Sequence, residues 1–304
     1  MIPLYCASKP IVATAVLGLV SAGEVDLDDT LDRFGLARLL PNASDTTIRG
    51  VLSHSTPLPD VEALIARMVA PRRRAELLSF PLNDASPTNP LYSVFVGWWM
   101  LAEVLSHVSG LSYGHAVRAL VLDPYGISPD ELWMQPGVSE TFDSSRVVTQ
   151  YQQFALGRAL PLCSDSFGEI AHTYNPAFSA YGTTEALSRF YRGVLNDIGG
   201  ANVVLEPEVA ELVTQVFSKG IDRATAHPFA FSLGFRVQLN ESMSPLLSPR
   251  SFGHPADGGA VLGFADPQSD VALAFAEPVM IHDFEAMRSR REARIASELD
   301  AVLV

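Results

Sequence analysis

The sequence has few cysteines and few basic residues, and each scarcity excludes a class of protein. Two cysteines in 304 residues, Cys6 and Cys163, can form at most one bridge, which excludes a disulfide framework. With 21 Lys and Arg against 34 Asp and Glu, the net charge is −13, and a surface of that charge repels phosphate backbones and anionic lipids. We therefore expect no nucleic-acid partner and no membrane partner.

Long hydrophobic runs are also missing. Residues 11–20 form an apolar run about half the ~20 residues that a bilayer-spanning helix needs. The first residues lack the basic start and small-residue cleavage site of a signal peptide, so a cytoplasmic location is expected. Two short basic runs, 72–74 and 288–291, lie in polar, helical contexts and are interpreted as solvated helix faces. At 48% hydrophobic and 18% charged residues, the chain can bury a large core.

Hydrophobic periodicity predicts a helical first half and a strand-rich end. Residues 11–20 are apolar on every side, which is typical of a buried helix, and Gly23 is a suitable stop. Helical spacing is also found at residues 61–68, 95–108, 113–122, 184–195 and 207–217. Short apolar runs predict antiparallel strands at 231–239, 259–265 and 271–276, with a hairpin turn at 265–270. The amphipathic tail 283–303 predicts a helix packed on that sheet through Met287, Ile295, Leu299 and Leu303.

Cys6 and Lys9 lie three residues apart at the predicted start of the buried helix. Their side chains then share one face, close to the free backbone N–H groups of the helix start. A helix N-terminus and a neighbouring ammonium both favour a thiolate, and a desolvated lysine could act as a base. The alternative is a buried cysteine beside a surface lysine with no chemical role.

Several segments, in order, match motifs of one enzyme family. Cys6-Ala7-Ser8-Lys9 matches S-x-x-K except at the nucleophile, and Leu27-Asp28-Asp29 matches the turn that follows. Further matches are residues 51–59 to "LLSHTSGLP", Tyr92-Ser93-Val94 to Tyr-x-Asn, Pro124-Tyr125-Gly126 to "PLG", 183–191 to the "sTa.dlaRFy" helix, and 252–259 with Asp266-Pro267 to "FGHxGxGG...DP". The chain thus resembles the serine β-lactamase-like family of class C β-lactamases, DD-peptidases and related esterases and transesterases.

The resemblance implies roles for the matched residues. Cys6 occupies the position of the acylated serine, Lys9 that of the general base, and Tyr92 that of the phenol that carries a proton. His254 falls in the third motif, and the backbone N–H groups of Cys6 and Asp257 would form the oxyanion hole. Ser93, Val94 and Ala256 would contact substrate. Each residue also has a structural alternative, such as a core tyrosine for Tyr92 or a packed strand residue for His254.

Four positions depart from the family pattern. Cysteine at position 6 keeps a nucleophile but makes the acyl-enzyme a thioester, which suits transfer as well as hydrolysis. Val94 replaces an Asn that binds the substrate amide, and Ala256 replaces a Gly that lets substrate approach the strand. Asp257 brings a carboxylate near the oxyanion. These departures equally fit lost activity, or a cysteine introduced to trap an acyl-enzyme.

Relatives carry a helix and two sheet strands before S-x-x-K, whereas the nucleophile here is at residue 6. A trimmed chain, strands supplied by another chain, or a reduced relative would each explain this. The strand at residues 271–276 should then be an open edge, exposed or paired with a homo-oligomer or partner chain.

The resemblance implies an α/β (α+β) fold of the β-lactamase/transpeptidase type, with an antiparallel sheet flanked by helices and a mainly helical lobe. Residues 1–304 would form one domain in two lobes, about 1–40 with 180–304 containing the sheet and about 41–179 mainly helical. The expected function is acyl hydrolysis or transfer on a small ester, thioester or amide. A catalytically silent protein used for binding or assembly is the alternative. No cofactor or metal is expected, because no His pair has ligand spacing and no Gly-rich phosphate loop follows a strand.

Overall fold

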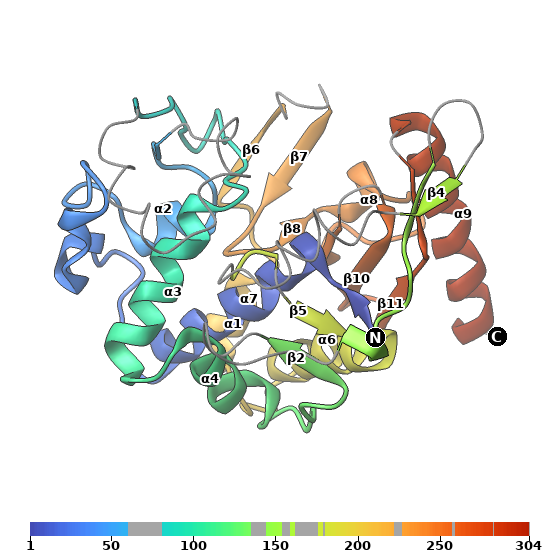
Figure 1. The fold of residues 1–304 in the computed structure, drawn as a ribbon, viewed down its shortest axis with the longest axis horizontal. Helices are drawn as coiled ribbons and strands as arrows, with labels where there is room; N and C mark the ends of the chain where they lie inside the picture. The colour runs from blue at the N-terminus through green and yellow to red at the C-terminus, as the bar shows by residue number, and fades with distance from the viewer. Residues whose placement is uncertain are drawn as a thin grey trace.

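The computed structural model describes residues 1–59, 81–134, 144–153, 159–161, 176–178, 180–221, 227–256, 259–281 and 283–303 (Figure 1). Cys163, residues 72–74 and the helix predicted at 61–68 lie outside these ranges. Among the described helices, none is both long and apolar enough to cross a bilayer.

A six-stranded antiparallel sheet forms the centre of the molecule, in the order β11-β10-β9-β8-β7-β6. Two three-stranded sheets, β1-β5-β2 and β12-β3-β4, lie beside it. The strands are β1 (Ile2–Pro3), β2 (Leu132–Met134), β3 (Tyr151–Gln153), β4 (Ala159–Pro161), β5 (Ala180–Gly182), β6 (Ser218–Ile221), β7 (Pro228–Phe231), β8 (Arg236–Val237), β9 (Phe252–Pro255), β10 (Val261–Asp266), β11 (Val271–Ala276) and β12 (Val279–Ile281).

The hairpin of β10 and β11 confirms the predicted strands and turn. Val261 pairs with Ala276 at one end of the hairpin and Asp266 with Val271 at the other. The buried Asp266 carboxylate stabilises the turn, since it accepts hydrogen bonds from the Gln268 N–H (3.0 Å) and from the N–H of Ser248 (2.7 Å). Within the described residues β11 pairs with β10 alone, so it forms one edge of the sheet.

The single strand predicted at residues 231–239 is wrong. β7 ends at Phe231, a turn follows, β8 covers two residues, and a helical turn begins at Leu239. Gly234 has a left-handed φ of 90°, and a Cβ there would lie 2.2 Å from Ala13 Cβ of the buried helix. The chain turns at this point because the approach to that helix leaves no room for a side chain.

The α-helices are α1 (Lys9–Ser21), α2 (Ile48–Leu52), α3 (Val96–Ser109), α4 (Tyr113–Val117), α6 (Thr184–Ile198), α7 (Pro207–Leu212), α8 (Leu239–Ser242) and α9 (Phe284–Leu303). The helix predicted at 113–122 is divided between α4 and a π-helical turn at Arg118–Leu122. The helix predicted at 207–217 ends at Leu212, because the chain then turns into β6.

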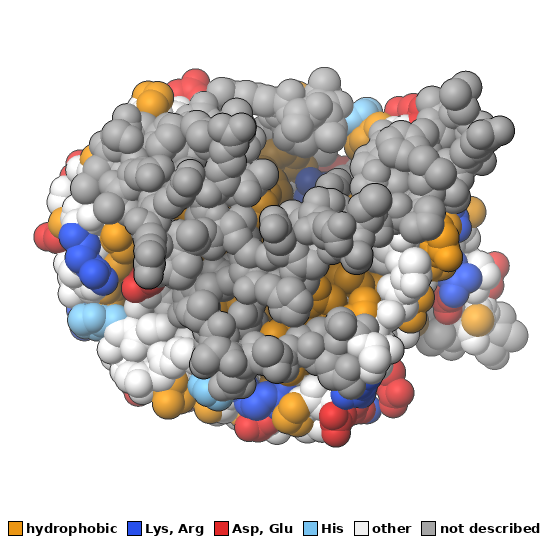
Figure 2. Space-filling model, in the orientation of Figure 1, with side chains coloured by type: hydrophobic (Ala, Val, Ile, Leu, Met, Phe, Trp, Pro, Cys, Tyr) orange, Lys and Arg blue, Asp and Glu red, His pale blue; other side chains and the backbone are white. Residues whose placement is uncertain are grey.

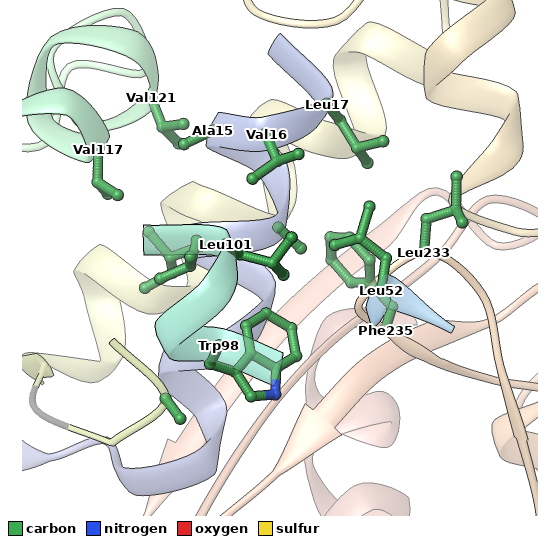
Figure 3. Packing of buried hydrophobic residues seen from close by; sticks show 14 of the residues in the cluster. Ala15, Val16, Leu17, Leu52, Trp98, Leu101, Val117, Val121, Leu233 and Phe235 are labelled. Atoms are coloured by element: carbon green, nitrogen blue, oxygen red, sulfur yellow. The ribbon is translucent and has the colours of Figure 1, made fainter. Parts of the chain in front are cut away.

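The buried helix α1 lies at the centre of the main core. Its apolar side chains, including Val16 and Leu17, pack between α3, the π-helical turn and the β7–β8 turn, where Leu233 and Phe235 close the cluster (Figure 3). α6 covers the same side of β10 and β11, with the Thr183 hydroxyl accepting the Ala186 N–H at its start. The all-apolar pattern of α1 therefore follows from protein on every side.

The opposite side of the sheet is covered by α9 (Figure 1). Ile295 and Leu299 form a second core with Leu262, Phe264 and Phe275 of the β10–β11 hairpin. This packing confirms the predicted tail helix. The sheet is thus sandwiched between α9 on one side and α1 with α6 on the other. Residues of β7, β9 and α9, together with Cys6 just before α1, line one cavity.

Candidate active site

Cys6 lies in a short 3₁₀ turn, Tyr5–Ser8, that leads directly into α1. Tyr5 has a left-handed φ of 46°, which costs a non-glycine residue about 1 kcal/mol or more. Its hydroxyl donates to Gln150 Oε1 and its ring contacts Phe178 edge-on at 4.9 Å, so buried contacts hold the conformation. The Cys6 side chain is 8% exposed and lines a cavity.

Lys9 is the first residue of α1 and is fully buried. Its Nζ donates to the Ala177 carbonyl oxygen at 3.3 Å. The same atom lies 5.0 Å from the centre of the Tyr92 ring and 5.8 Å from that of Trp98. The Lys9 amine is therefore held inside the protein beside Tyr92. Lys9 itself begins α1, three residues after Cys6.

Tyr92 and His254 come from distant segments and meet at the cavity. The Tyr92 hydroxyl lies 3.3 Å from His254 Nε2, and His254 Nδ1 lies 2.8 Å from the Pro255 carbonyl oxygen. A carbonyl oxygen only accepts, so Nδ1 carries the proton and Nε2 has a free lone pair. The Tyr92 hydroxyl consequently donates its proton toward His254.

The charge state of His254 agrees with this tautomer. Its imidazole is 2% exposed, and burial, followed by the positive charges of Lys9 and Arg236, holds its pKa well below the ordinary value of 6.5. His254 is neutral at physiological pH. It can accept a proton from Tyr92 only at a substantial cost, so the phenol keeps its proton in the resting site.

A second buried imidazole, His54, supports the same tyrosine. His54 Nδ1 accepts the Ser93 N–H at 2.9 Å, and its ring lies 4.9 Å from that of Tyr92 and 4.4 Å from that of Phe231. Burial, with Lys9 and Arg236, holds the pKa of His54 well below its usual range. Because Nδ1 accepts, Nε2 carries the hydrogen, and no group among the described residues accepts a hydrogen bond from that buried atom.

The cavity has a volume of about 870 Å³. Cys6, Tyr92 and His254 line it together with aromatic and aliphatic side chains: Val94, Phe95, Phe178, Phe229, Ile281, Phe284 and Met287. Three arginines also reach it, namely Arg236, Arg288 and Arg291. Figure 2 looks into a hollow with hydrophobic walls and a basic side chain inside.

This arrangement can support nucleophilic acyl chemistry. A thiol, a phenol with its proton and a neutral imidazole face one space, with a buried amine behind the phenol. Comparison with known families adds an independent finding, because residues 1–296 match the family model described as Beta-lactamase. The chain belongs to the Beta-lactamase family.

Solved structures show the same fold for this Beta-lactamase-family chain. D-amino acid amidase from Ochrobactrum anthropi SV3 has a TM-score of 0.74 at 18% identity, covering 99% of this chain and 82% of that one. A penicillin-binding protein homolog from Caulobacter crescentus gives 0.70 at 21% identity, covering 97% and 83%. EstA from Arthrobacter nitroguajacolicus Rue61a gives 0.68 at 18%, covering 95% and 83%. A search of curated proteins found no match.

Of the three residues predicted to contact substrate in this Beta-lactamase-family chain, two line the cavity and one does not. Val94 and Ala256 line the cavity. Ser93 does not, because its hydroxyl accepts the Gly97 N–H at 2.9 Å and its carbonyl accepts the Trp98 Nε1–H, so it caps the start of α3. Asp257, predicted to supply an oxyanion-hole N–H, lies outside the described residues. Ser8 is buried with its hydroxyl accepting the Ala180 N–H.

Sequence reasoning missed Arg291, and the interpretation of residues 288–291 as a solvated face is wrong there. Arg288 and Arg290 are exposed, but Arg291 is only 8% exposed. The signal was present, since residues 287, 291, 295 and 299 repeat every four positions and Arg291 fills the gap in the apolar stripe. Among the described residues, no group of three metal-binding side chains is found.

Proposed function

We propose that this chain is an acyl-enzyme hydrolase or acyltransferase that acts on a small ester, thioester or amide, with Cys6 as its nucleophile. The observation that carries the proposal is that Cys6, Tyr92 and His254 line one cavity while Lys9 is buried beside Tyr92. Membership of the Beta-lactamase family and the amidase and esterase among its structural neighbours support the reaction class.

The first step forms a thioester. The Lys9 ammonium of the resting site first releases a proton to solvent. The neutral amine then takes the thiol proton of Cys6, the sulfur bonds to the substrate carbonyl carbon, and the bond to the alcohol, thiol or amine breaks. The leaving group takes a proton from the Tyr92 hydroxyl, which is replenished from Lys9. Because His254 Nε2 accepts from the Tyr92 hydroxyl, it holds the phenol at the cavity wall between turnovers.

The second step releases the acyl group. Water, or an alcohol, thiol or amine acceptor, attacks the thioester carbon and gives its proton to the Tyr92 oxygen as the phenol proton moves on to the neutral Lys9 amine. The Cys6 sulfur leaves as thiolate and takes its proton from Lys9, which returns to the neutral amine. Hydrolysis and transfer differ only in which acceptor occupies the cavity.

Intact-protein mass spectrometry tests the proposal. Wild type, Cys6→Ala and Cys163→Ala are exposed to 4-nitrophenyl acetate, a phenyl thioester, an amino acid amide and a β-lactam. An adduct with at least one donor that is lost in Cys6→Ala and kept in Cys163→Ala supports the proposal. Absence of any adduct, with a Cys6 thiol unreactive toward iodoacetamide at neutral pH, refutes it and favours the silent alternative.

We also propose that a second copy of this chain covers the β11 edge. Within the described residues β11 has one strand neighbour, so the backbone groups on its other side are available for the addition of another strand. Light scattering after gel filtration should give at least a dimer, with slow hydrogen exchange at 271–276. A monomer at every concentration, with fast exchange there, contradicts this proposal.

A further inference from the structure

His54 is a buried residue in a conformation that histidine rarely adopts. It lies two residues after α2, is 1% exposed and has a left-handed φ of 56°. That conformation costs a residue other than glycine about 1 kcal/mol or more. Hydrogen bonds fix the chain on both sides, since the His54 N–H donates to the Val51 carbonyl at 3.2 Å and the Ser55 N–H to that of Gly50 at 2.9 Å. A histidine held in this way is expected to make contacts that offset the cost.

Both neighbours of Tyr92 in the chain donate a hydrogen bond to His54. The Leu91 N–H donates to the His54 carbonyl oxygen at 3.1 Å, and the Ser93 N–H donates to His54 Nδ1 at 2.9 Å. Residues 91–93 belong to no helix or strand of the structure, so no regular ladder fixes their path. Tyr92 thus lies between two backbone groups that are bound to one and the same residue.

Ring contacts continue from this backbone clamp to the phenol. The His54 ring lies 4.9 Å from the Tyr92 ring and 4.4 Å from the Phe231 ring, and Phe231 stacks on Tyr92 at 5.8 Å. The Tyr92 hydroxyl then lies 3.3 Å from His254 Nε2, and the Lys9 amine lies 5.0 Å from the centre of the Tyr92 ring. A shift of residues 91–93 would therefore move the hydroxyl relative to both the imidazole and the amine.

We propose that His54 is a positioning residue for Tyr92, and that its carbonyl oxygen and its Nδ1 hold the phenol where the hydroxyl can protonate the leaving group. The inference rests on the function proposed above. Tyr92 lines the cavity and His54 does not, so His54 acts through Tyr92 and transfers no proton itself. A misplacement of about 1 Å can slow a reaction about 10²-fold, which makes such a clamp worth its strained backbone.

Three variants separate what His54 supplies. His54→Asn keeps a side-chain acceptor and tolerates the left-handed conformation, but it lacks the ring. His54→Gly keeps only the backbone conformation and its carbonyl, and His54→Phe keeps a ring without an acceptor. For acylation of Cys6 by benzyl acetate we expect His54→Asn to stay within about threefold of wild type and the other two to be about 10- to 100-fold slower.

The leaving group shows whether the phenol is what has moved. A thiolate leaves a tetrahedral intermediate more readily than an unprotonated alkoxide, so benzyl acetate needs the proton from Tyr92. The 4-nitrophenolate ion is stable and leaves without it. His54→Gly should therefore slow acylation by 4-nitrophenyl acetate less than about threefold. A loss of folded enzyme would slow both esters alike, so equal slowing by both overturns the proposal.

A double-mutant cycle and a stability control complete the test. With Tyr92→Phe already present, His54→Gly should slow benzyl acetate no further, because there is no hydroxyl left to position. Asp197→Ala is the control, since this buried carboxylate accepts from the Tyr125 hydroxyl at 2.7 Å and does not line the cavity. It should destabilise the protein without changing the ratio of the two ester rates. Full additivity of the His54 and Tyr92 changes contradicts the proposal.

Hydrogen exchange needs no acyl donor and separates this proposal from the proposed function. The Ser93 amide should exchange faster in His54→Gly and His54→Phe than in wild type, and as slowly in His54→Asn as in wild type. If wild type takes no acyl group from any donor but exchange follows this order, the function fails and the clamp on residues 91–93 stands. Equal exchange in all four proteins overturns the clamp. If His54→Gly does not fold, His54→Phe against His54→Asn gives the same comparison.

Discussion

The stability of this protein should fall steeply between pH 7 and pH 5 because two imidazoles are buried in the neutral form. His54 and His254 are 1% and 2% exposed, and burial with the charges of Lys9 and Arg236 holds both pKa values well below 6.5. In the unfolded chain each imidazole binds a proton below about pH 6.5. The unfolded state therefore binds more protons, and folding stability present above that pH is lost as the pH falls.

The size of the effect follows from linkage. A histidine that stays neutral when folded but titrates near 6.5 when unfolded loses about 2 kcal/mol of stability between pH 7 and pH 5. Two such residues give about 4 kcal/mol, a large part of the 5–15 kcal/mol typical of a folded domain. The carboxyls of Asp28 and Asp29 contribute little to the change in stability between pH 7 and pH 5. Hydrogen bonds from Arg49 and Arg33 lower their pKa values further below 4, outside that range.

Urea unfolding at pH 5 and pH 7 measures the change. His54→Asn keeps an acceptor for the Ser93 N–H, and His254→Gln keeps a polar atom for Tyr92; each should remove about 2 kcal/mol of the pH dependence. His107→Gln, at an exposed position of α3, should leave that dependence nearly unchanged. If the difference between the two pH values persists in both buried-histidine variants, the assignment of neutral imidazoles is refuted.

Further predictions concern the phenol, a buried carboxylate and a strand contact. Tyr92→Phe keeps the ring stacked on Phe231 (5.8 Å) but removes the hydroxyl that carries the proton. Acylation of Cys6 by an amide should slow about 10²- to 10⁴-fold with little change in melting temperature, and an unchanged rate would rule out the phenol as the proton carrier. Asp197→Ala leaves the Tyr125 hydroxyl and the Val203, Val204 and Leu205 N–H groups without their acceptor, and urea unfolding should show a loss of about 3 kcal/mol. Gly263→Ala places a Cβ 2.2 Å from the Tyr191 ring and should destabilise by about 1–3 kcal/mol, whereas Gly18→Ala in α1 meets only an ordinary contact with Val204 at 3.6 Å and should cost less.

Much of the fold follows from local patterns in the sequence. The all-apolar run at residues 11–20 becomes α1, and the apolar runs on either side of Asp266-Pro267 become the β10–β11 hairpin. The stripe in the tail becomes the face of α9 on the sheet. These elements were predictable because each is set by periodicity over its own residues.

What escaped prediction depends on contacts between distant segments. The break between β7 and β8 arises where Gly234 meets Ala13, over two hundred positions earlier in the chain. The family motif predicts Ser93 as a substrate contact, and only the fold places its hydroxyl on the Gly97 N–H. For the candidate site, the family motifs predicted catalytic roles for Cys6, Lys9, Tyr92 and His254. Arg291 was missed because charged residues in a stripe are almost always solvated.

The cavity wall formed by α9 lies far along the chain from the groups proposed to react. The groups proposed to make and break bonds come from the start of α1, the approach to α3 and β9, whereas one wall of the cavity is carried by α9. Changes confined to the cavity-facing positions of that helix would retune which molecules enter while leaving the reacting atoms where they are. Substituting positions 284, 287, 288 and 291 in combination is thus a direct route to variants that share one chemistry and differ in the compounds they accept.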